Sequence, residues 1–472
     1  MNKEITLENY EEKRRALIDA NANPLGVILS EKERRLDGVL TALKKEYQQS
    51  CGGSVPYHVP VLTDRSLTAS RLYRFCSMLP KGADLHVHDM AQLPLRELTA
   101  LLAECREFCI NTDHVHYDLI RVDGGQAVPK GYKRFCDAVA DGTMTEDELR
   151  LNWTVLGADA HGMGVWDWFE ALFEKHAVLS NYTDFSLIYY DRTLRYYCQH
   201  GIMHMEIHML LSDDLETCEA CIEGVREAYY RVKRDYPYLS VKVIGAGLKN
   251  DRENLEITKK CFLNTLYAHE NIKDCFDSKH PTDFVIGFDL INEEDNSLPL
   301  HDFAPLLLRV KKKYPSLHFY LHGGESLSAE NDNLIDAYLL DVSRVGHGLN
   351  LYRYPDLLER YAKSEICLEV CPISNQTLGY TQDLRSHPAA EYLRRGVAVA
   401  LCSDDPTYQE NETLTDDFFA AALCWNLDLA DLKQLAINSI QYSGLAQQEK
   451  TSLLKEFRKK WEEFVDRALE EF

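Results

Sequence analysis

Eight short apolar or alternating runs recur along the chain from residue 83 onward, and most of them are separated by stretches with helical periodicity. They are ADLHVH (83–88), IMHMEIH (202–208), VKVIGAG (241–247), FVIGFDL (284–290), LHFYLH (317–322), RVGHG (344–348), ICLEVC (366–371) and VAVALCS (397–403). Strands that alternate with helices predict a parallel sheet covered by those helices. Eight is the number of strands that closes a (β/α)8 barrel, so we predict an α/β protein of the TIM-barrel type.

Two segments exceed what a minimal barrel needs. Residues 1–78 are predicted to form an N-terminal helical arm, in which Ser30 and Glu33 have the spacing of a capping box. We expect this arm to serve in packing or in a dimer contact. The interval after the first strand is too long for one crossover helix, so it is predicted to carry an inserted subdomain at about residues 90–160, acting as a lid or a packing element. The barrel domain would then span residues 79–472.

The acidic balance of the chain limits its partners. With 52 basic and 75 acidic residues the net charge is −23, which argues against binding nucleic acid or an anionic membrane through a basic patch. A small nucleoside in a pocket remains compatible with this charge. No run reaches the roughly 18 apolar residues of a membrane helix.

The N-terminal residues and the cysteines together suggest a compartment. The first twenty residues, MNKEITLENYEEKRRALIDA, are charged and lack the apolar core of a secretion signal. We therefore expect a cytoplasmic location, where the 14 cysteines would be free thiols.

His86 and His88 flank one valine in the first predicted strand. Side chains two residues apart on a strand point the same way, so two imidazoles aimed at one spot would suit a bound metal. Taken alone, the pair is more simply explained by two half-buried, hydrogen-bonded histidines.

Further ionisable residues stand at the carboxyl ends of successive predicted strands, where a barrel places its active site. They are Asp289, Asn292, Glu293 and Asp295 after the fourth strand, His322 and Glu325 after the fifth, His347 after the sixth, and Asp404 and Asp405 after the eighth. So many buried imidazoles and carboxylates are costly unless they are paired or bind a metal, which makes the metal interpretation the better one.

Three imidazoles and one carboxylate are ligands that zinc accepts. His86, His88, His322 and Asp404 could hold it and make a nucleophilic water available at neutral pH. Glu325 is then placed to carry protons to or from a substrate, and His347 to orient or deprotonate the water.

With this ordered set, HxH … HGGE … GHG … SDDP, the chain resembles the adenosine deaminase family of the amidohydrolase superfamily. It is most similar to the branch of adenosine deaminase-related growth factors, or adenosine deaminase 2. The similar stretches include MLPKGADLHVHD (78–89), VWDWFE (165–170), GFDLINEEDNSLPLHDF (287–303), LEVCPISNQTLG (368–379) and LKQLAINSIQYS (432–443).

The resemblance implies a hydrolytic deamination of adenosine or 2′-deoxyadenosine to inosine or 2′-deoxyinosine and ammonia. It implies one zinc per chain on the four ligands named above, and a homodimer through the N-terminal helices. It further implies that Glu325 protonates N1 of the purine and that His347 positions the water. Asp405 would hold the water or a ring nitrogen, while Asp89 and Trp166 would contact the ribose.

The chain departs from the branch at Asn292 and Glu293, which stand where Gly-His is usual. Asparagine adopts a glycine-like backbone more readily than most residues, but the missing histidine removes an expected ribose contact. A modified adenosine, adenine or an adenosine phosphate are therefore alternative substrates.

Two other functions compete with a one-metal deaminase: a non-catalytic binding protein and a two-metal hydrolase. A non-catalytic nucleoside-binding or signalling relative would be expected to have lost a ligand or the acid, and the chain keeps both. A two-metal hydrolase would need a bridging lysine or glutamate at the end of the fourth strand, and no lysine accompanies Asp289 there. We assign His204 and His208 to the barrel wall, and the CPISNQ segment (371–376) chiefly to support of the seventh strand.

Overall fold

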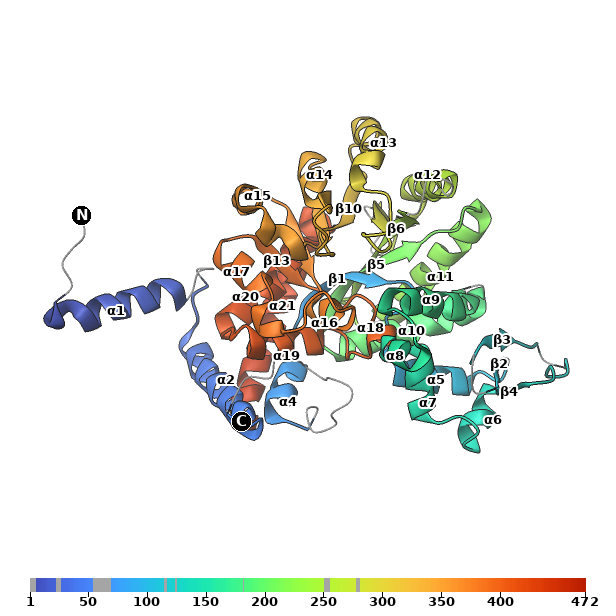
Figure 1. The fold of residues 1–472 in the computed structure, drawn as a ribbon, viewed down its shortest axis with the longest axis horizontal. Helices are drawn as coiled ribbons and strands as arrows, with labels where there is room; N and C mark the ends of the chain where they lie inside the picture. The colour runs from blue at the N-terminus through green and yellow to red at the C-terminus, as the bar shows by residue number, and fades with distance from the viewer. Residues whose placement is uncertain are drawn as a thin grey trace.

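The computed structural model describes residues 6–22, 27–53, 69–113, 117–123, 125–180, 182–249, 255–276 and 281–472. At its centre eight parallel strands form one sheet with helices on the outside (Figure 1). The strands are β1 (Gly82–His88), β5 (Ile202–Leu210), β6 (Ser240–Leu248), β9 (Val285–Ile291), β10 (His318–Gly323), β11 (Arg344–His347), β12 (Cys367–Val370) and β13 (Ala398–Leu401). Each overlaps one of the eight predicted runs, which confirms the (β/α)8 prediction.

The strands are hydrogen-bonded in chain order, and the residues after β13 meet β1 again. Val87 forms an isolated parallel bridge with Asp404. The amide of Asp404 donates to the carbonyl of His86 at 3.0 Å, and the amide of His88 donates to the carbonyl of Asp404 at 3.1 Å. Barrel closure therefore fixes the backbone of Asp404 beside that of both histidines.

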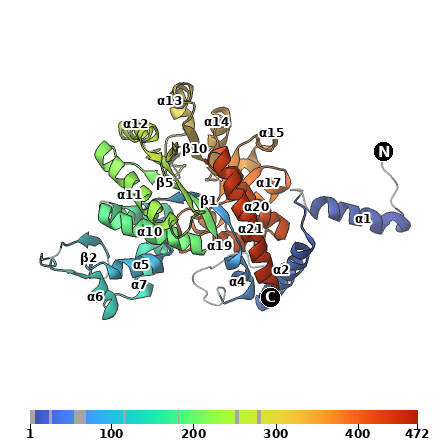
Figure 2. The same ribbon diagram turned by 180° about the vertical axis from the view of Figure 1, so that it is seen from behind.

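Most of the outer helices bury one apolar face, as amphipathic helices do, whereas α19 (Leu414–Cys424) is buried along its whole length. They include α11 (Leu215–Lys233), α12 (Leu255–Asn271), α13 (Leu300–Lys313), α14 (Asn333–Leu339), α15 (Pro355–Tyr361), α17 (Ala389–Arg394), α19 (Leu414–Cys424) and α20 (Leu429–Gln441). The last helix, α21 (Gln447–Glu471), crosses the barrel on the side seen in Figure 2 and buries Phe457, Trp461 and Phe464. No helix among the described residues is both long and apolar enough to cross a bilayer.

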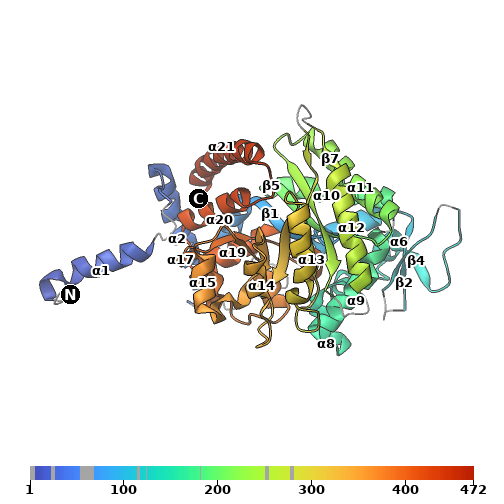
Figure 3. The same ribbon diagram turned by 90° about the horizontal axis from the view of Figure 1, so that it is seen from above.

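The first two helices of the N-terminal arm differ in how they pack against the barrel. The first, α1 (Leu7–Ala22), extends away from the barrel (Figures 1 and 3). The second, α2 (Glu31–Ser50), packs against α21 and α4 (Arg71–Met78). The predicted capping box at Ser30 and Glu33 is present, and Glu33 also accepts a hydrogen bond from Trp461 Nε1 at 2.8 Å. The packing role thus holds for α2, while the dimer contact stays a prediction.

Between β1 and β5 the chain forms a small antiparallel sheet of its own at the end of the molecule opposite α1 (Figure 1). Its strands are β2 (Phe108–Asn111), β3 (Leu119–Arg121) and β4 (Tyr132–Arg134), and its helices are α5 (Leu95–Glu104), α6 (Phe135–Ala140), α7 (Glu146–Trp153) and α8 (Ala158–His161). Strands this short show no measurable period in a sequence. Arg150 pairs with Glu410 at 2.6 Å and so attaches this insert to the loop after β13. The exact boundaries of the subdomain stay a prediction.

Candidate active site

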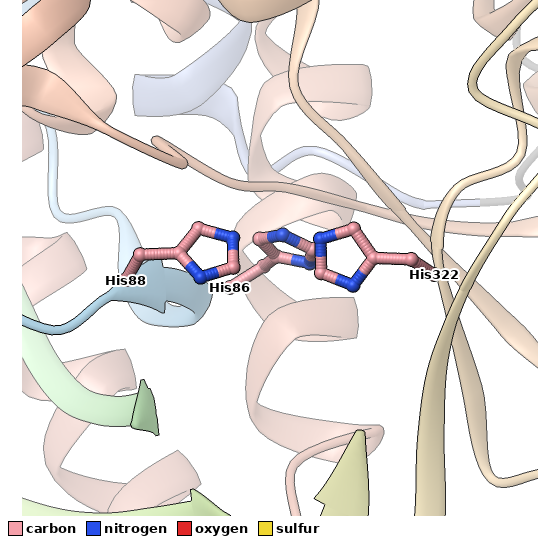
Figure 4. Close-up of side chains that lie close together, drawn as sticks. All are labelled: His86, His88 and His322. Carbon is pink, nitrogen blue, oxygen red and sulfur yellow. The ribbon is translucent and has the colours of Figure 1, made fainter. Parts of the chain in front are cut away.

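Three imidazoles converge at the carboxyl ends of β1 and β10 (Figure 4). The ring centroids of His86 and His322 lie 4.4 Å apart, and those of His88 and His322 lie 5.3 Å apart. One ring nitrogen of each lies within 4.8 Å of the other two. Nε2 of His86 is buried and has no hydrogen-bond partner among the described residues. A buried nitrogen without a partner, facing two others, fits a metal ligand.

Asp404 completes this group from the loop after β13. Its Oδ1 lies 3.2 Å from Nε2 of His88 and 3.8 Å from Nε2 of His86. Burial raises the pKa of Asp404, but the hydrogen bond to His88 and the neighbouring imidazoles outweigh burial and hold the pKa well below its usual value. The carboxyl group is therefore ionised, as a metal ligand must be. All four predicted ligands lie together.

Two buried carboxylates orient the imidazoles from behind. Glu369 Oε2 lies 2.8 Å from Nδ1 of His86, and Asp289 Oδ2 lies 2.7 Å from Nδ1 of His322. Because a carboxylate only accepts, each Nδ1 carries the proton and each Nε2 keeps its lone pair for a metal. Sequence reasoning gave neither carboxylate this role.

His204 and His208 lie on β5, a strand of the barrel wall, as expected, and the side chain of His208 also reaches this region. The Nδ1 of His208 shares Asp289 Oδ2 at 2.7 Å, and its ring stacks on His86 with centroids 4.6 Å apart. His204 lies nearer the start of β5 and pairs with Glu206 at 2.9 Å. The HMEIH run carried the signal, because it shows the same i, i+2 alternation of polar side chains as HVH.

Glu325 and His347 lie next to the four ligands. Burial raises the pKa of Glu325 well above its usual value, and the charges of Asp404 and Glu294 add to the effect. Burial thus favours the protonated form of Glu325, and that form can donate. Its Oε1 lies 3.6 Å from Nε2 of His347, whose pKa is lowered by burial. A carboxyl group that favours its protonated form and an imidazole that favours its neutral form pair a proton donor with a proton acceptor.

Asp405 lies beside Asp404 with its Oδ1 buried and without a partner among the described residues. Burial raises its pKa well above the usual value, and the adjacent Asp404 raises it further. Asp89 accepts a hydrogen bond from Tyr190, and burial raises the pKa of Asp89 to about 6. The contacts of both side chains with a substrate stay predictions.

The remaining predicted substrate residues stand around the same site. Trp166, on α9 (Val165–Ser180), donates its Nε1–H to the hydroxyl of Tyr380 at 2.6 Å. Burial raises the pKa of Tyr380, and the charges of Glu325, Asp295 and Glu293 raise it further. Asn292 has φ 120°, a glycine-like backbone as predicted. Tyr380 was missed because nothing in its local sequence indicates a site.

The CPISNQ segment reaches the site as well as supporting β12 (Cys367–Val370). Asn375 Nδ2 lies 3.5 Å from Nδ1 of His347. The sulfur of Cys371 lies within 4.8 Å of ligand atoms of His86 and Asp404. Structural support of the seventh strand was the favoured expectation and a role in lining the pocket the second one; these contacts favour the second, which stays a prediction.

Comparison with known proteins agrees with this geometry. The family model described as adenosine deaminase matches residues 156–460, well over half of the chain. Adenosine deaminase 2 of Dictyostelium discoideum is 27% identical over 98% of this chain and 88% of that protein. Two solved structures share the fold. The adenine deaminase of Arthrobacter aurescens has a TM-score of 0.56 and 23% identity, over 80% of this chain and 98% of its own.

The second solved structure is the N6-methyl-AMP deaminase of Arabidopsis thaliana, with a TM-score of 0.56 and 15% identity, over 82% of this chain and 98% of its own. The range matched by the family model contains His322, Glu325, His347 and Asp404. The chain belongs to the adenosine deaminase family and is a metal-dependent hydrolytic deaminase.

Proposed function

We propose that the chain removes the 6-amino group of adenosine or 2′-deoxyadenosine with water, and releases inosine or 2′-deoxyinosine and ammonia, with one zinc ion per chain. The observation that carries the proposal is the position of the buried Glu325, whose pKa burial raises, beside one group of four nitrogen and oxygen ligands.

The ligand set favours zinc. His86, His88, His322 and Asp404 would hold it, because a borderline cation accepts both imidazole and carboxylate. When bound, the ion supplies a Lewis acid that makes a nucleophilic water available near neutral pH. Glu369 and Asp289 face the Nδ1 atoms of His86 and His322 instead of a second ion, which supports one metal and not two.

The side chains of this protein would move the protons. Glu325 donates its proton to N1 of the purine, which makes C6 electrophilic. His347 accepts a proton from the attacking water, whose oxygen bonds to C6. The bond between C6 and the amino nitrogen then breaks, and the nitrogen leaves as ammonia with the proton that His347 held. The proton left on the C6 hydroxyl returns to Glu325, which yields the C6 carbonyl of the product. The partnerless Oδ1 of Asp405 is available to a ring nitrogen of the base.

The charge around Glu293 favours an uncharged substrate. Burial raises the pKa of Glu293, and the neighbouring charges of Asp295, Glu170 and Asp167 raise it further. A phosphate near these carboxylates would be repelled, which argues against an adenosine phosphate. Because Glu293 replaces an expected ribose contact, adenine or a modified adenosine remains the second candidate.

The test is a deamination screen of the zinc-loaded protein. Adenosine, 2′-deoxyadenosine, adenine, N6-methyladenosine and AMP are compared by ammonia release, with the loss of adenosine absorbance as a second readout. We expect adenosine and 2′-deoxyadenosine to react fastest, and Glu325→Gln serves as the inactive control. If nothing in the panel releases ammonia while zinc stays bound, the deaminase proposal fails and a nucleoside-binding role replaces it.

We also propose a cytoplasmic location and a homodimer. All 14 cysteines are free thiols, as a reducing compartment would keep them. The projecting α1 supports a contact with a second copy. Light scattering should give twice the chain mass for the full chain and the single mass after deletion of residues 1–22; a monomeric full chain would refute the dimer.

A further inference from the structure

A line of buried, paired charges runs through the barrel interior behind the metal ligands. Glu369 Oε2 contacts Nδ1 of His86 at 2.8 Å, and Arg344 Nε donates to the other oxygen of Glu369. Arg344 Nη2 donates to Glu206 Oε2 at 2.5 Å. All four side chains have 0% exposure. A barrel interior is ordinarily filled by branched apolar residues, so this ion-paired line calls for an explanation.

The guanidinium of Arg344 is held on every side. Arg344 begins β11, and Glu206 lies on β5, four strands away in the eight-stranded order, so the side chain spans the interior. Its Nη1 donates to the carbonyl of Tyr442 at 3.0 Å, and the ring of Tyr320 lies 3.9 Å from its Cζ. Buried ion pairs are often replaceable by apolar side chains without loss of stability. Stability alone therefore does not account for this arginine.

The consequence of this arrangement falls on His86. The planar fork of arginine fixes the carboxylate that it binds more firmly than a flexible ammonium could. With Oε1 of Glu369 held by Arg344, Oε2 stays directed at Nδ1 of His86. The corresponding carboxylate behind His322 is held differently. Asp289 Oδ2 accepts from His208 and His322, and its Oδ1 accepts from the backbone amides of Leu290 and His322.

We infer that Arg344 is a positioning residue for the metal centre. Through Glu369 it keeps His86 in the form that carries its proton on Nδ1, with Nε2 free for the metal, and it thereby sets metal affinity without touching metal or substrate. The inference rests on the proposed metal site.

Glu206 offers a matched control on the other side of the same guanidinium. Its Oε1 accepts from His204 Nε2 at 2.9 Å and from the amide of Gly444 at 2.5 Å. Glu206→Gln therefore weakens a buried pair with Arg344 but leaves the contact between Glu369 and His86 intact. If these ion pairs only supported the fold, a change on either side of Arg344 would have the same effect on zinc affinity.

The experiment is a zinc titration by chelator competition on the full chain, with thermal unfolding of the metal-free protein as a measure of the fold. Loss of a carboxylate that orients a ligand typically weakens metal binding about 10- to 100-fold. We expect Arg344→Lys to weaken zinc affinity by that amount and Glu206→Gln by less than about threefold. In case Arg344→Lys does not fold, the double variant Arg344→Gln/Glu206→Gln removes one charge of each sign and should show the same loss relative to Glu206→Gln.

Wild-type zinc affinity in the arginine variants, or an equal loss in Glu206→Gln, would overturn the inference. A metal-free readout separates this result from failure of the proposed function. In histidine-15N-labelled protein the His86 signal, assigned by its absence in His86→Gln, should report a proton on Nδ1 in the wild type and a mixture of both forms in Arg344→Lys. If the wild-type chain binds no zinc, the metal proposal fails. Independently of zinc, the positioning role is overturned if His86 keeps its proton on Nδ1 in Arg344→Lys as it does in the wild type.

Discussion

Replacement of Glu325 by glutamine separates proton transfer from charge and packing. The wild-type side chain is 3% exposed, and burial together with Asp404 and Glu294 raises its pKa well above the usual value. Its protonated form is therefore favoured, and glutamine matches both the charge and the shape of that form. We expect metal affinity to be preserved and kcat to fall about 10²- to 10⁴-fold, which corresponds to about 2.7–5.4 kcal/mol of activation free energy.

Stability supplies a second signature of the same group. A carboxyl group whose folded pKa is raised stabilises the fold fully below its unfolded pKa, near 4.3, and that contribution is lost as the pH rises toward the folded pKa. Glutamine does not titrate. Between the unfolded and the folded pKa of Glu325, the free energy of unfolding of metal-free Glu325→Gln should therefore rise relative to that of the wild type by about 1.4 kcal/mol per pH unit.

Steady-state kinetics on adenosine and urea unfolding at pH 5, 6 and 7 in the presence of chelator measure the two effects. Unchanged kcat in Glu325→Gln would remove Glu325 from proton transfer. A stability difference that does not vary across these pH values would show that Glu325 is ionised in the folded protein.

Four further substitutions test individual contacts. Asp404→Ala should lose metal on dialysis because it removes the carboxylate ligand, and full metal occupancy measured by mass spectrometry would contradict the ligand assignment. Asp405→Asn should keep the metal and lose activity. Asp289→Asn should weaken metal affinity about 10- to 100-fold because it disturbs the bond that orients His322, and chelator titration showing no change would remove that role. Glu293→His should raise kcat/KM for adenosine relative to adenine, and an unchanged ratio would mean that this position does not touch the sugar.

The strands were predictable because a parallel barrel buries both faces of each strand, so each appears as a short apolar run with flanking helical periodicity. All eight runs became strands of one sheet. The insert was located only by the length of its interval. Its internal sheet could not be predicted, because β3 and β4 span three residues each and show no period.

At the site, the residues that stand at strand ends were predictable, because topology alone brings those ends together. His86, His88, His322 and Asp404 belong to this class. Glu369 and Arg344 do not, because Glu369 lies inside β12 and Arg344 is the first residue of β11, away from the carboxyl ends of the strands. From the sequence, a single polar residue in a strand does not reveal which distant strand its side chain contacts. The contact between Glu206 on β5 and Arg344 on β11 forms only when the barrel closes.

The most direct test of the account is anomalous diffraction at the zinc edge from crystals of the zinc-loaded protein. We expect one peak per chain, in contact with the side chains of His86, His88, His322 and Asp404, with Glu325 and His347 beside it. Two peaks, or a single peak at His208 and Asp289 away from Asp404, would contradict the mononuclear site on which the proposed deamination depends.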